Sequence, residues 1–279
     1  MLVNLNSVLK YAEEHNCAIG SFNTPNLEAM IAVISAAEEL NVPVIIMHAQ
    51  CHEEWAPLDI VGPIMKLMAE RAKVPVCIHL DHCEDIDYLK RAIDLGFTSV
   101  MLDASAKSYD ENVRLTKMAV ALAKDKNVSV EAEIGVLGGR EAGDSKPLTK
   151  EEMYTDPDLA KRFVEDTNID ALACSFGTAH GFYKEKPQLD FARIEKIRKL
   201  VGIPLVMHGG SGVPQEDYVK AIKLGVEKIN YYSYMSREGV NATKELADKN
   251  IPFFHEIASY VTEKMKKDVL RAMKIFYSL

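Results

Sequence analysis

Eight short β-rich runs alternate with longer helix-patterned segments along the whole chain, and this alternation constrains the fold more than any other feature. The runs occupy residues 17–22, 42–48, 74–81, 99–103, 128–134, 171–175, 205–208 and 228–231. In the segments between them, apolar residues recur every three or four positions, as on the buried face of a helix. Repeated βα units predict parallel strands, because each helix carries the chain back to the same edge of the sheet.

Eight such units in 279 residues predict an α/β fold, a (β/α)8 TIM barrel, rather than an open doubly wound sheet. No GxGxxG sequence follows the first run, as a dinucleotide-binding sheet would require. No linker rich in Pro, Gly or Ser divides the chain, so we expect a single domain over residues 1–279. An amphipathic C-terminal helix is expected from Pro252 onward. The apolar stripe that should pack it against the barrel or a second subunit consists of Met265, Val269, Met273 and Phe276.

Composition and charge exclude several other classes of protein. The chain has 33 basic and 41 acidic residues and no basic run with interleaved aromatics, so we expect no nucleic-acid partner. No apolar stretch approaches the roughly 20 residues that cross a bilayer, and the N-terminus lacks a signal pattern, so we expect a cytoplasmic protein without a membrane partner. The five cysteines show no CxxC spacing, which favours reduced thiols.

Three histidines, His82, His180 and His208, each fall where a predicted strand passes into a small polar loop. The carboxyl ends of barrel strands meet at one mouth, so the three imidazoles are expected to converge there. Three neutral imidazoles with an open fourth position are typical of a catalytic zinc site. A single histidine at a strand end is more often a core residue, and it is the shared placement that favours a metal.

Two further features are expected at the same mouth. The glycine-rich segment 209–212 follows the seventh strand and the segment 230–233 follows the eighth, where many barrels bind phosphate. An ordinary glycine-rich turn is the alternative. Asp81, next to His82, is placed to move a proton, or else to orient the neighbouring imidazole. A metal, a phosphate site and a carboxylate together predict proton removal beside a carbonyl, which leaves an enediolate.

Six ordered sequence blocks then support a resemblance over nearly the whole chain. They are HLDHCED (79–85), SVMLDASA (99–106), VEAEIGVLGGRE (130–141), YTDPDLAKRFVEDTNIDALACSFGTAHGFYK (154–184), PLVMHGGSGVP (204–214) and GVEKIN (225–230). With these blocks the chain resembles the class II, metal-dependent ketose-bisphosphate aldolases, the family of fructose- and tagatose-bisphosphate aldolases.

The resemblance implies roles for named residues. It implies a catalytic zinc on His82, His180 and His208, and it makes Asp81 the proton carrier at the hydroxyl beside the cleaved C–C bond. Glu133 and Asp103 match family positions that form an alternative metal site or orient the ligands. Glu141 matches a glutamate on a mobile loop that transfers a proton at the ketose carbon.

The resemblance also implies the ligands. The cradle for dihydroxyacetone phosphate would consist of Gly181, Gly209, Ser211 and Ser233, the last in place of the usual threonine. Asn230 would contact the oxygens of this substrate, and we assign Asn23 to substrate binding as well. The implied cofactor is Zn²⁺ or another divalent metal, and a monovalent cation near the phosphate is common in the family. The implied partners are a phosphorylated ketose or dihydroxyacetone phosphate, in a homodimer or homotetramer.

The chain departs from the family pattern at the other end of the pocket. Ala104 and Ala106 replace a glycine and a histidine, and Ala49 stands near the usual serine. Two bulky residues, Tyr231 and Tyr232, occupy the turn after the last strand. No residue matches the arginine that binds a second phosphate in some members of the family. We therefore expect the metal site and the site for the first phosphate to follow the family pattern. The part of the pocket that binds the aldehyde is expected to differ from it.

We therefore expect a zinc-dependent aldolase that reversibly cleaves a ketose 1-phosphate or 1,6-bisphosphate. The products would be dihydroxyacetone phosphate and an aldehyde such as glyceraldehyde 3-phosphate. Two alternatives remain at this point. One is a sugar-phosphate isomerase or epimerase that uses the same enediolate, and the other is a non-catalytic, aldolase-like assembly subunit.

Overall fold

The structure, a computed structural model, describes residues 1–135, 154–247 and 249–279. Within these residues eight parallel strands form a closed barrel, because β9 pairs with β2 at one seam and β4 pairs with β5 at the other. The eight strands are β2 (Ile19–Asn23), β3 (Val44–Ala49), β4 (Val76–Cys83), β5 (Ser99–Leu102), β6 (Ser129–Ile134), β7 (Ala171–Cys174), β8 (Leu205–Met207) and β9 (Val226–Tyr231). The predicted (β/α)8 barrel is confirmed.

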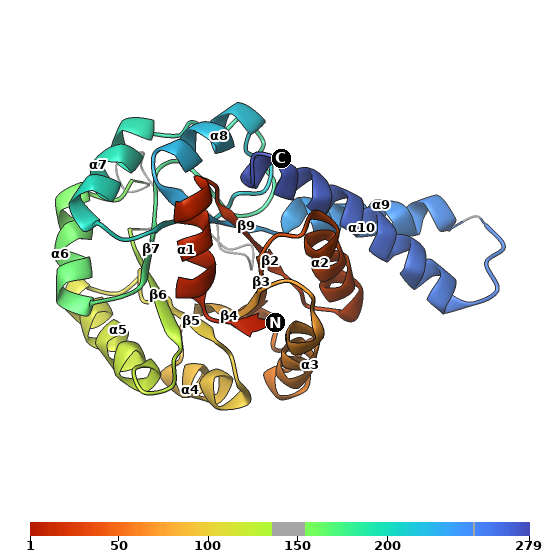
Figure 1. Ribbon diagram of the computed structural model, residues 1–279, viewed down its shortest axis with the longest axis horizontal. Coiled ribbons are helices and arrows are strands. Elements are labelled where there is room, and N and C mark those ends of the chain that lie inside the picture. The colour runs from red at the N-terminus through yellow and green to blue at the C-terminus, as the bar shows by residue number, and fades with distance from the viewer. Residues whose placement is uncertain (136–153, 248) are drawn as a thin grey trace.

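Helices surround the barrel and return the chain from each strand to the next (Figure 1). They are α2 (Leu27–Leu40), α3 (Leu58–Arg71), α4 (Ile86–Leu95), α5 (Tyr109–Ala123), α6 (Pro157–Thr167), α7 (Phe191–Val201), α8 (Gln215–Lys223) and α9 (Ser233–Leu246). Local sequence sets their ends: Asn26, Asp85 and Asp156 each cap a helix by accepting first-turn N–H groups. Gly96 and Asn168 end α4 and α6 in the left-handed conformation.

The N-terminal segment closes the end of the barrel opposite the predicted site. The short strand β1 (Leu2–Val3) pairs with the start of β4, and α1 (Leu5–His15) runs across the centre of the ring in Figure 1. Asn6 fixes α1 there, because its N–H donates to Ser129 Oγ and its amide donates to Asp170, at the starts of β6 and β7. The predicted runs did not include β1 or α1. With this end covered, the carboxyl ends of the strands are the open mouth.

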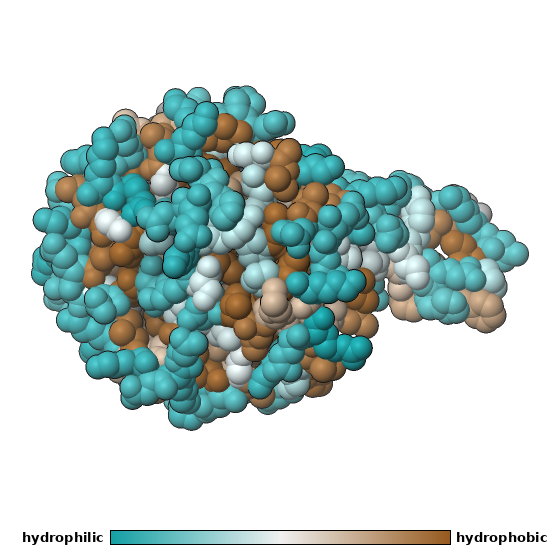
Figure 2. Space-filling view, in the orientation of Figure 1, coloured by the Kyte–Doolittle hydropathy of each residue, from teal (hydrophilic) through white to brown (hydrophobic). Residues whose placement is uncertain are grey.

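The last helix, α10 (Phe254–Phe276), packs along α2 and α9. Its predicted stripe is buried within this chain, with Val269, Met273 and Phe276 at 0% exposure. The outer parts of α9 and α10 run out together from the ring as an arm (Figure 1). Hydrophobic side chains gather on the surface between barrel and arm, over the side of α2 and α3 (Figure 2). None of the described helices is both long and apolar enough to cross a bilayer.

Candidate active site

The backbone of β4 brings two consecutive residues, Asp81 and His82, into the same site. Neighbouring side chains on a regular strand point to opposite faces, so the pair could not normally share one. His82 has a positive φ of 44°, and the pairing of β4 with β5 shifts register between Leu80 and Cys83. This local irregularity turns the imidazole of His82 to the mouth while Asp81 keeps its inward position.

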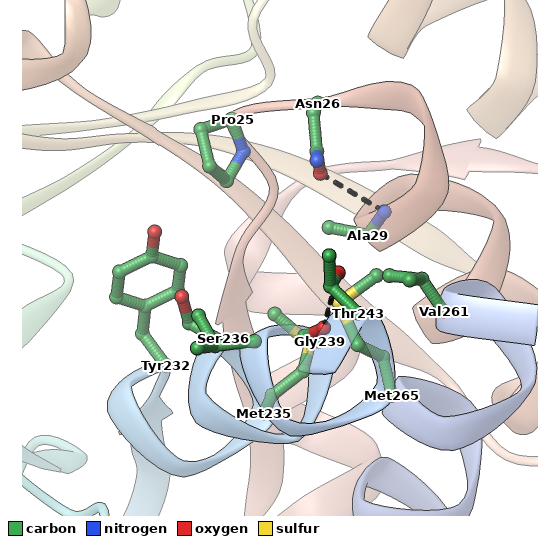
Figure 3. A pocket seen from close by; sticks show the side chains of 11 residues that line it. Pro25, Asn26, Ala29, Tyr232, Met235, Ser236, Gly239, Thr243, Val261 and Met265 are labelled. Carbon is green, nitrogen blue, oxygen red and sulfur yellow. Dashed lines mark hydrogen bonds between the residues drawn. The ribbon is translucent and has the colours of Figure 1, made fainter. Parts of the chain in front are cut away.

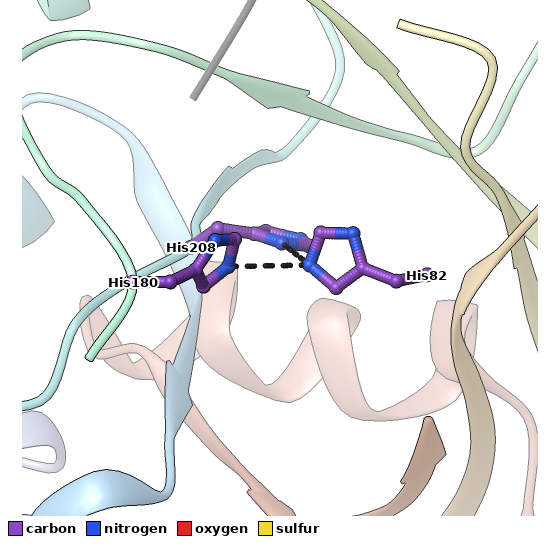
Figure 4. Close-up of side chains that lie close together, drawn as sticks. All are labelled: His82, His180 and His208. Carbon is purple, nitrogen blue, oxygen red and sulfur yellow. Dashed lines mark hydrogen bonds between the residues drawn. The ribbon is translucent and has the colours of Figure 1, made fainter. Parts of the chain in front are cut away.

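The three predicted histidines come together, from the ends of β4, β7 and β8 (Figure 4). His82 Nε2 lies 3.2 Å from His180 Nε2 and 2.8 Å from His208 Nδ1. Nitrogens that share a tetrahedral zinc ion at about 2.0–2.1 Å are separated by about 3.3 Å. The ligand atoms of all three rings lie within 4.8 Å of one another. The spacing therefore fits one shared divalent cation.

Carboxylates fix two of these rings so that the correct nitrogen faces the centre. Asp103 Oδ2 lies 2.8 Å from His82 Nδ1, and Glu131 Oε1 lies 2.8 Å from His208 Nε2. A proton on each outer nitrogen leaves a lone pair on His82 Nε2 and on His208 Nδ1, which are the two atoms that converge. A carboxylate behind the imidazole is the usual support of a metal-binding histidine.

A second group of ligand atoms, from His82, Asp103 and Glu133, also lies within 4.8 Å of one another. Glu133 is 1% exposed, and its Oε2 has no hydrogen-bond partner among the described residues. Burial and the nearby carboxylates of Asp103 and Glu131 raise the pKa of Glu133 well above its usual value. A cation in the cluster would relieve this repulsion, so the buried donor set fits a divalent metal.

A buried lysine lies beneath the histidines, and sequence reasoning assigned it no role. Lys228 is 0% exposed and pairs with Glu131 Oε2 at 2.9 Å and with Asn230 Oδ1 at 2.8 Å. Burial alone would raise the pKa of Glu131, but Lys228 and the neighbouring His79 and His208 lower it to about 2. The signal that could have revealed this pair is the presence of a charged residue within a buried strand, Glu131 in β6 and Lys228 in β9.

Asp81 is a buried carboxylate held by two amides. Its Oδ2 accepts a hydrogen bond from Asn23 Nδ2 at 3.2 Å, and its Oδ1 accepts one from Asn230 Nδ2 at 3.1 Å. Burial acts to raise the pKa of Asp81, but its electrostatic interactions with His82, His208 and Lys228 outweigh burial and hold the pKa below its ordinary range. Asp81 is therefore ionised, and it lies next to the histidine cluster.

The loops predicted to hold phosphate are also brought together. Ser211 Oγ accepts the backbone N–H groups of Tyr232 and Ser233 at 2.9 and 3.1 Å, which joins the β8 loop to the start of α9. Gly209 has a φ of +61°, and a Cβ there would lie 2.4 Å from the carbonyl oxygen of Ala179. Only glycine fits this approach of the β7 and β8 loops.

Gly181 lies in the same region. Among the described residues, a Cβ built at Gly181 meets no atom within 4 Å, and the backbone there has a φ of +91°. Tyr183 holds the surrounding loops, since its hydroxyl accepts the N–H of Ala179 and donates to the carbonyl of Gly209. Glycine loops at a helix N-terminus form an anion site, so the arrangement suits a phosphate.

Glu141 lies outside the described residues. A cavity of about 260 Å³ lies beside the mouth, between the start of α2 and helices α9 and α10 (Figure 3). Its lining includes Tyr232, Ser236 and Thr243 but none of the metal-binding candidates.

Comparisons with known proteins agree with this geometry. The family model described as fructose-bisphosphate aldolase class-II matches residues 3–279. A fructose-bisphosphate aldolase of Geobacillus stearothermophilus is 40% identical, over 99% of this chain and 97% of the relative. A 6-phospho-5-dehydro-2-deoxy-D-gluconate aldolase of Halalkalibacterium halodurans is 39% identical, over 99% and 96%. The crystal structure of the YdjI aldolase from Escherichia coli K12 superposes with a TM-score of 0.88 at 36% identity, covering 99% of this chain and 97% of that one.

Proposed function

Since the chain belongs to the class II fructose-bisphosphate aldolase family, it is an aldehyde-lyase, and we propose that His82, His180 and His208 hold its catalytic divalent cation. The single observation that carries this proposal is the convergence of His82 Nε2, His180 Nε2 and His208 Nδ1 from three strand ends. Three imidazoles and an open position favour zinc among the common divalent metals. Asp103 and Glu133 hold or orient the ion from the other side of His82.

In this proposal Asp81 is the base that starts cleavage. Asp81 accepts the proton of the C4 hydroxyl, the C3–C4 bond breaks to release the aldehyde, and its electrons pass toward the C2 carbonyl. The bound cation supplies Lewis acidity at the ketose carbonyl. The enediolate that remains takes up a proton at C3 and becomes dihydroxyacetone phosphate. The family resemblance assigns this last proton transfer to Glu141.

Asn230 and Asn23 position the base and reach the substrate from the ends of β9 and β2. Lys228 holds the oxygen of the Asn230 amide, so the Asn230 NH₂ group must face Asp81. We propose that Gly181, Gly209, Ser211 and Ser233 cradle the phosphate of dihydroxyacetone phosphate. A monovalent cation beside this phosphate belongs to the same proposal.

We also propose the substrate class, the oligomeric state and the location of the protein. The substrate is a ketose with a phosphate on C1, and the relatives' names differ in what lies at the other end. We propose a homodimer or homotetramer, supported by the exposed apolar residues of α2 and α3. A cytoplasmic location is supported by cysteines that form no disulfide among the described residues.

The test is a cleavage assay with ketose 1-phosphates and 1,6-bisphosphates as substrates. Dihydroxyacetone phosphate is detected by a coupled reductase, and the remaining sugar phosphates are analysed by NMR. Release of dihydroxyacetone phosphate that stops on chelation and returns with Zn²⁺ supports the proposal. Conversion of one ketose phosphate into another without cleavage would instead establish an isomerase or epimerase, and binding without any turnover would establish a scaffold.

A further inference from the structure

A row of three rings lines one part of the barrel mouth, and we call it the aromatic wall: His52, Trp55 and Tyr232. The ring of His52 lies 5.8 Å from that of Trp55 and 5.7 Å from that of Tyr232, measured between centroids. His52 ends the short 3₁₀ turn η1 (Gln50–His52), which follows β3 directly. Tyr232 follows β9. The wall therefore joins loops that are distant in sequence.

The topology places the aromatic wall next to the proposed base. In the barrel β2 lies between β3 and β9, so His52 and Tyr232 meet across the end of β2. That end carries Asn23, whose amide binds Asp81. Tyr232 also precedes Ser233, which belongs to the proposed phosphate cradle. Consider a ketose whose phosphate is bound at this cradle and whose C4 hydroxyl lies at Asp81. The carbons beyond C4 would then lie against the aromatic wall.

His52 presents an unused polar atom in this wall. It is 5% exposed, and its Nδ1 has no hydrogen-bond partner among the described residues. A buried polar atom left without a partner is destabilising, so such an atom at an active-site wall points to a ligand. A hydroxyl group can satisfy Nδ1 in either tautomer of the ring, because a hydroxyl both donates and accepts.

The loops on this side of the mouth carry negative and no positive residues. The loops after β2, β3 and β4, residues 23–26, 49–57 and 81–85, contain no Lys or Arg. Besides Asp81 they contain Glu53, Glu54, Glu84 and Asp85, of which Glu54, Glu84 and Asp85 are exposed. A phosphate dianion placed here would be repelled by these carboxylates, and these three loops provide no Lys or Arg as a counter-charge. An uncharged group meets no such penalty.

We infer that the aldehyde partner of this enzyme is an uncharged, hydroxylated aldehyde, and that His52 is the residue that selects it. A hydroxyl of the aldehyde bonds to His52, and its C–H surface packs on Trp55 and Tyr232. This inference rests on the proposed aldolase function. In the condensation direction the C–C bond forms between C3 of the dihydroxyacetone phosphate enediolate and the aldehyde carbon, and Asp81 returns a proton to the new hydroxyl. No further reactant is needed.

The experiment first tests the dihydroxyacetone phosphate half of the reaction alone. Exchange of its C3 proton for deuterium in D₂O, followed by NMR, requires the metal and the phosphate cradle but no aldehyde. The metal-loaded enzyme is then given glyceraldehyde or glyceraldehyde 3-phosphate, which differ only in the phosphate. We expect exchange, and a kcat/KM at least about tenfold higher for glyceraldehyde, since a factor of ten is about 1.4 kcal/mol of discrimination.

Two variants test the residues. His52→Ala should lower kcat/KM for glyceraldehyde about tenfold, mainly through KM, because one neutral hydrogen bond is lost. Its rate of proton exchange should not change. Glu54→Lys should raise kcat/KM for glyceraldehyde 3-phosphate several-fold. The matched control is Glu70→Lys, an exposed position in the last turn of α3, at the other end of the barrel.

The failures are distinguishable. Exchange together with a preference for glyceraldehyde 3-phosphate would overturn the inference and leave the aldolase function in place. The inference also fails, with the aldolase function intact, if His52→Ala slows both aldehydes and the exchange reaction equally, since the residue would then be structural. Absence of exchange in the metal-loaded enzyme would overturn the proposed function and this inference together.

Discussion

At the scale of single residues, the site depends on one strained position. His82 is a non-glycine residue with positive φ inside a strand, a conformation that costs of order 1–3 kcal/mol. The strain allows both adjacent side chains to face one site, as their proposed roles of metal ligand and base require. Sequence reasoning predicted both roles from the pair Asp81 and His82, but alternation along a regular strand could not show how they face the same way.

Asp81→Asn tests the base. An amide cannot accept the proton of the C4 hydroxyl, so we expect kcat for ketose cleavage to fall about 10²- to 10⁴-fold. Zinc content, measured by mass spectrometry of the purified protein, should stay near that of the wild type. Asp87→Asn, an exposed change in the first turn of α4, is the control and should keep full activity. A variant at position 81 with more than about a tenth of wild-type kcat would contradict the assignment.

His48 gives the protein an acid-sensitive stability. Its Nε2 lies 2.8 Å from the hydroxyl of Tyr88, which itself donates to Glu53 at 2.6 Å. Burial, together with the neighbouring His52, lowers the pKa of His48 to about 4. The unfolded chain binds this proton near pH 6.5, so the stabilisation is complete above that pH and is lost as pH falls toward 4.

The lowered pKa of His48, about 4 against an ordinary 6.5, corresponds to about 3 kcal/mol. We therefore expect the free energy of unfolding in urea to fall by up to about that amount between pH 7 and pH 4. His48→Gln keeps a donor for Tyr88 but cannot titrate, and its decline over this range should be smaller. An equal decline in wild type and variant would refute the explanation. His255→Gln, at an exposed position, is the control.

At the scale of elements, the strands were predictable and parts of their surroundings were not. All eight barrel strands lie within two residues of the predicted runs, because buried parallel strands leave a continuous apolar signal. The short β1 has no such signal, and both β1 and α1 precede the first predicted run. The third run was expected to end at Asp81, whereas β4 continues to Cys83 through the irregular His82.

The polar core of the barrel was the other part that the sequence left open. The histidine convergence followed from the fold, since strand ends meet. The Lys228–Glu131 pair did not, because a lysine in an apolar run is compatible with an edge or a surface position until the closed barrel encloses it. The aldehyde end depends on the loops after β2, β3 and β9, and sequence periodicity does not predict loop conformations.

The C-terminal helix should contribute strongly to stability through one aromatic residue. Phe276 is fully buried and lies 5.0 Å from the ring of Tyr218 and 6.1 Å from that of Tyr231. We expect Phe276→Ala to lower the free energy of unfolding by about 3–5 kcal/mol, measured by urea denaturation. Phe254→Ala, in the same helix but 79% exposed, should change it by less than about 0.5 kcal/mol. Similar losses for the two variants would contradict the packing described for α10.

At the scale of the whole molecule, the exposed apolar residues predict self-association. Ile60, Ile64 and Leu67 on α3 are 63%, 40% and 54% exposed. Analytical ultracentrifugation should give at least a dimer at micromolar concentration, and Ile60→Lys with Ile64→Lys should shift it toward monomer. Leu159→Lys on α6, a similarly apolar but isolated position, should leave the assembly unchanged. A wild-type monomer at all concentrations would contradict this prediction.

The central claim is that three histidines from three strand ends share one catalytic cation, and metal titration of the stripped enzyme tests it most directly. Cleavage of a ketose phosphate to dihydroxyacetone phosphate is followed as Zn²⁺ is added to the metal-free protein. We predict no activity without metal, a linear rise to a plateau at one equivalent per chain, and no recovery in His208→Ala. Full activity in the stripped protein, or an unchanged titration in His208→Ala, would contradict the account.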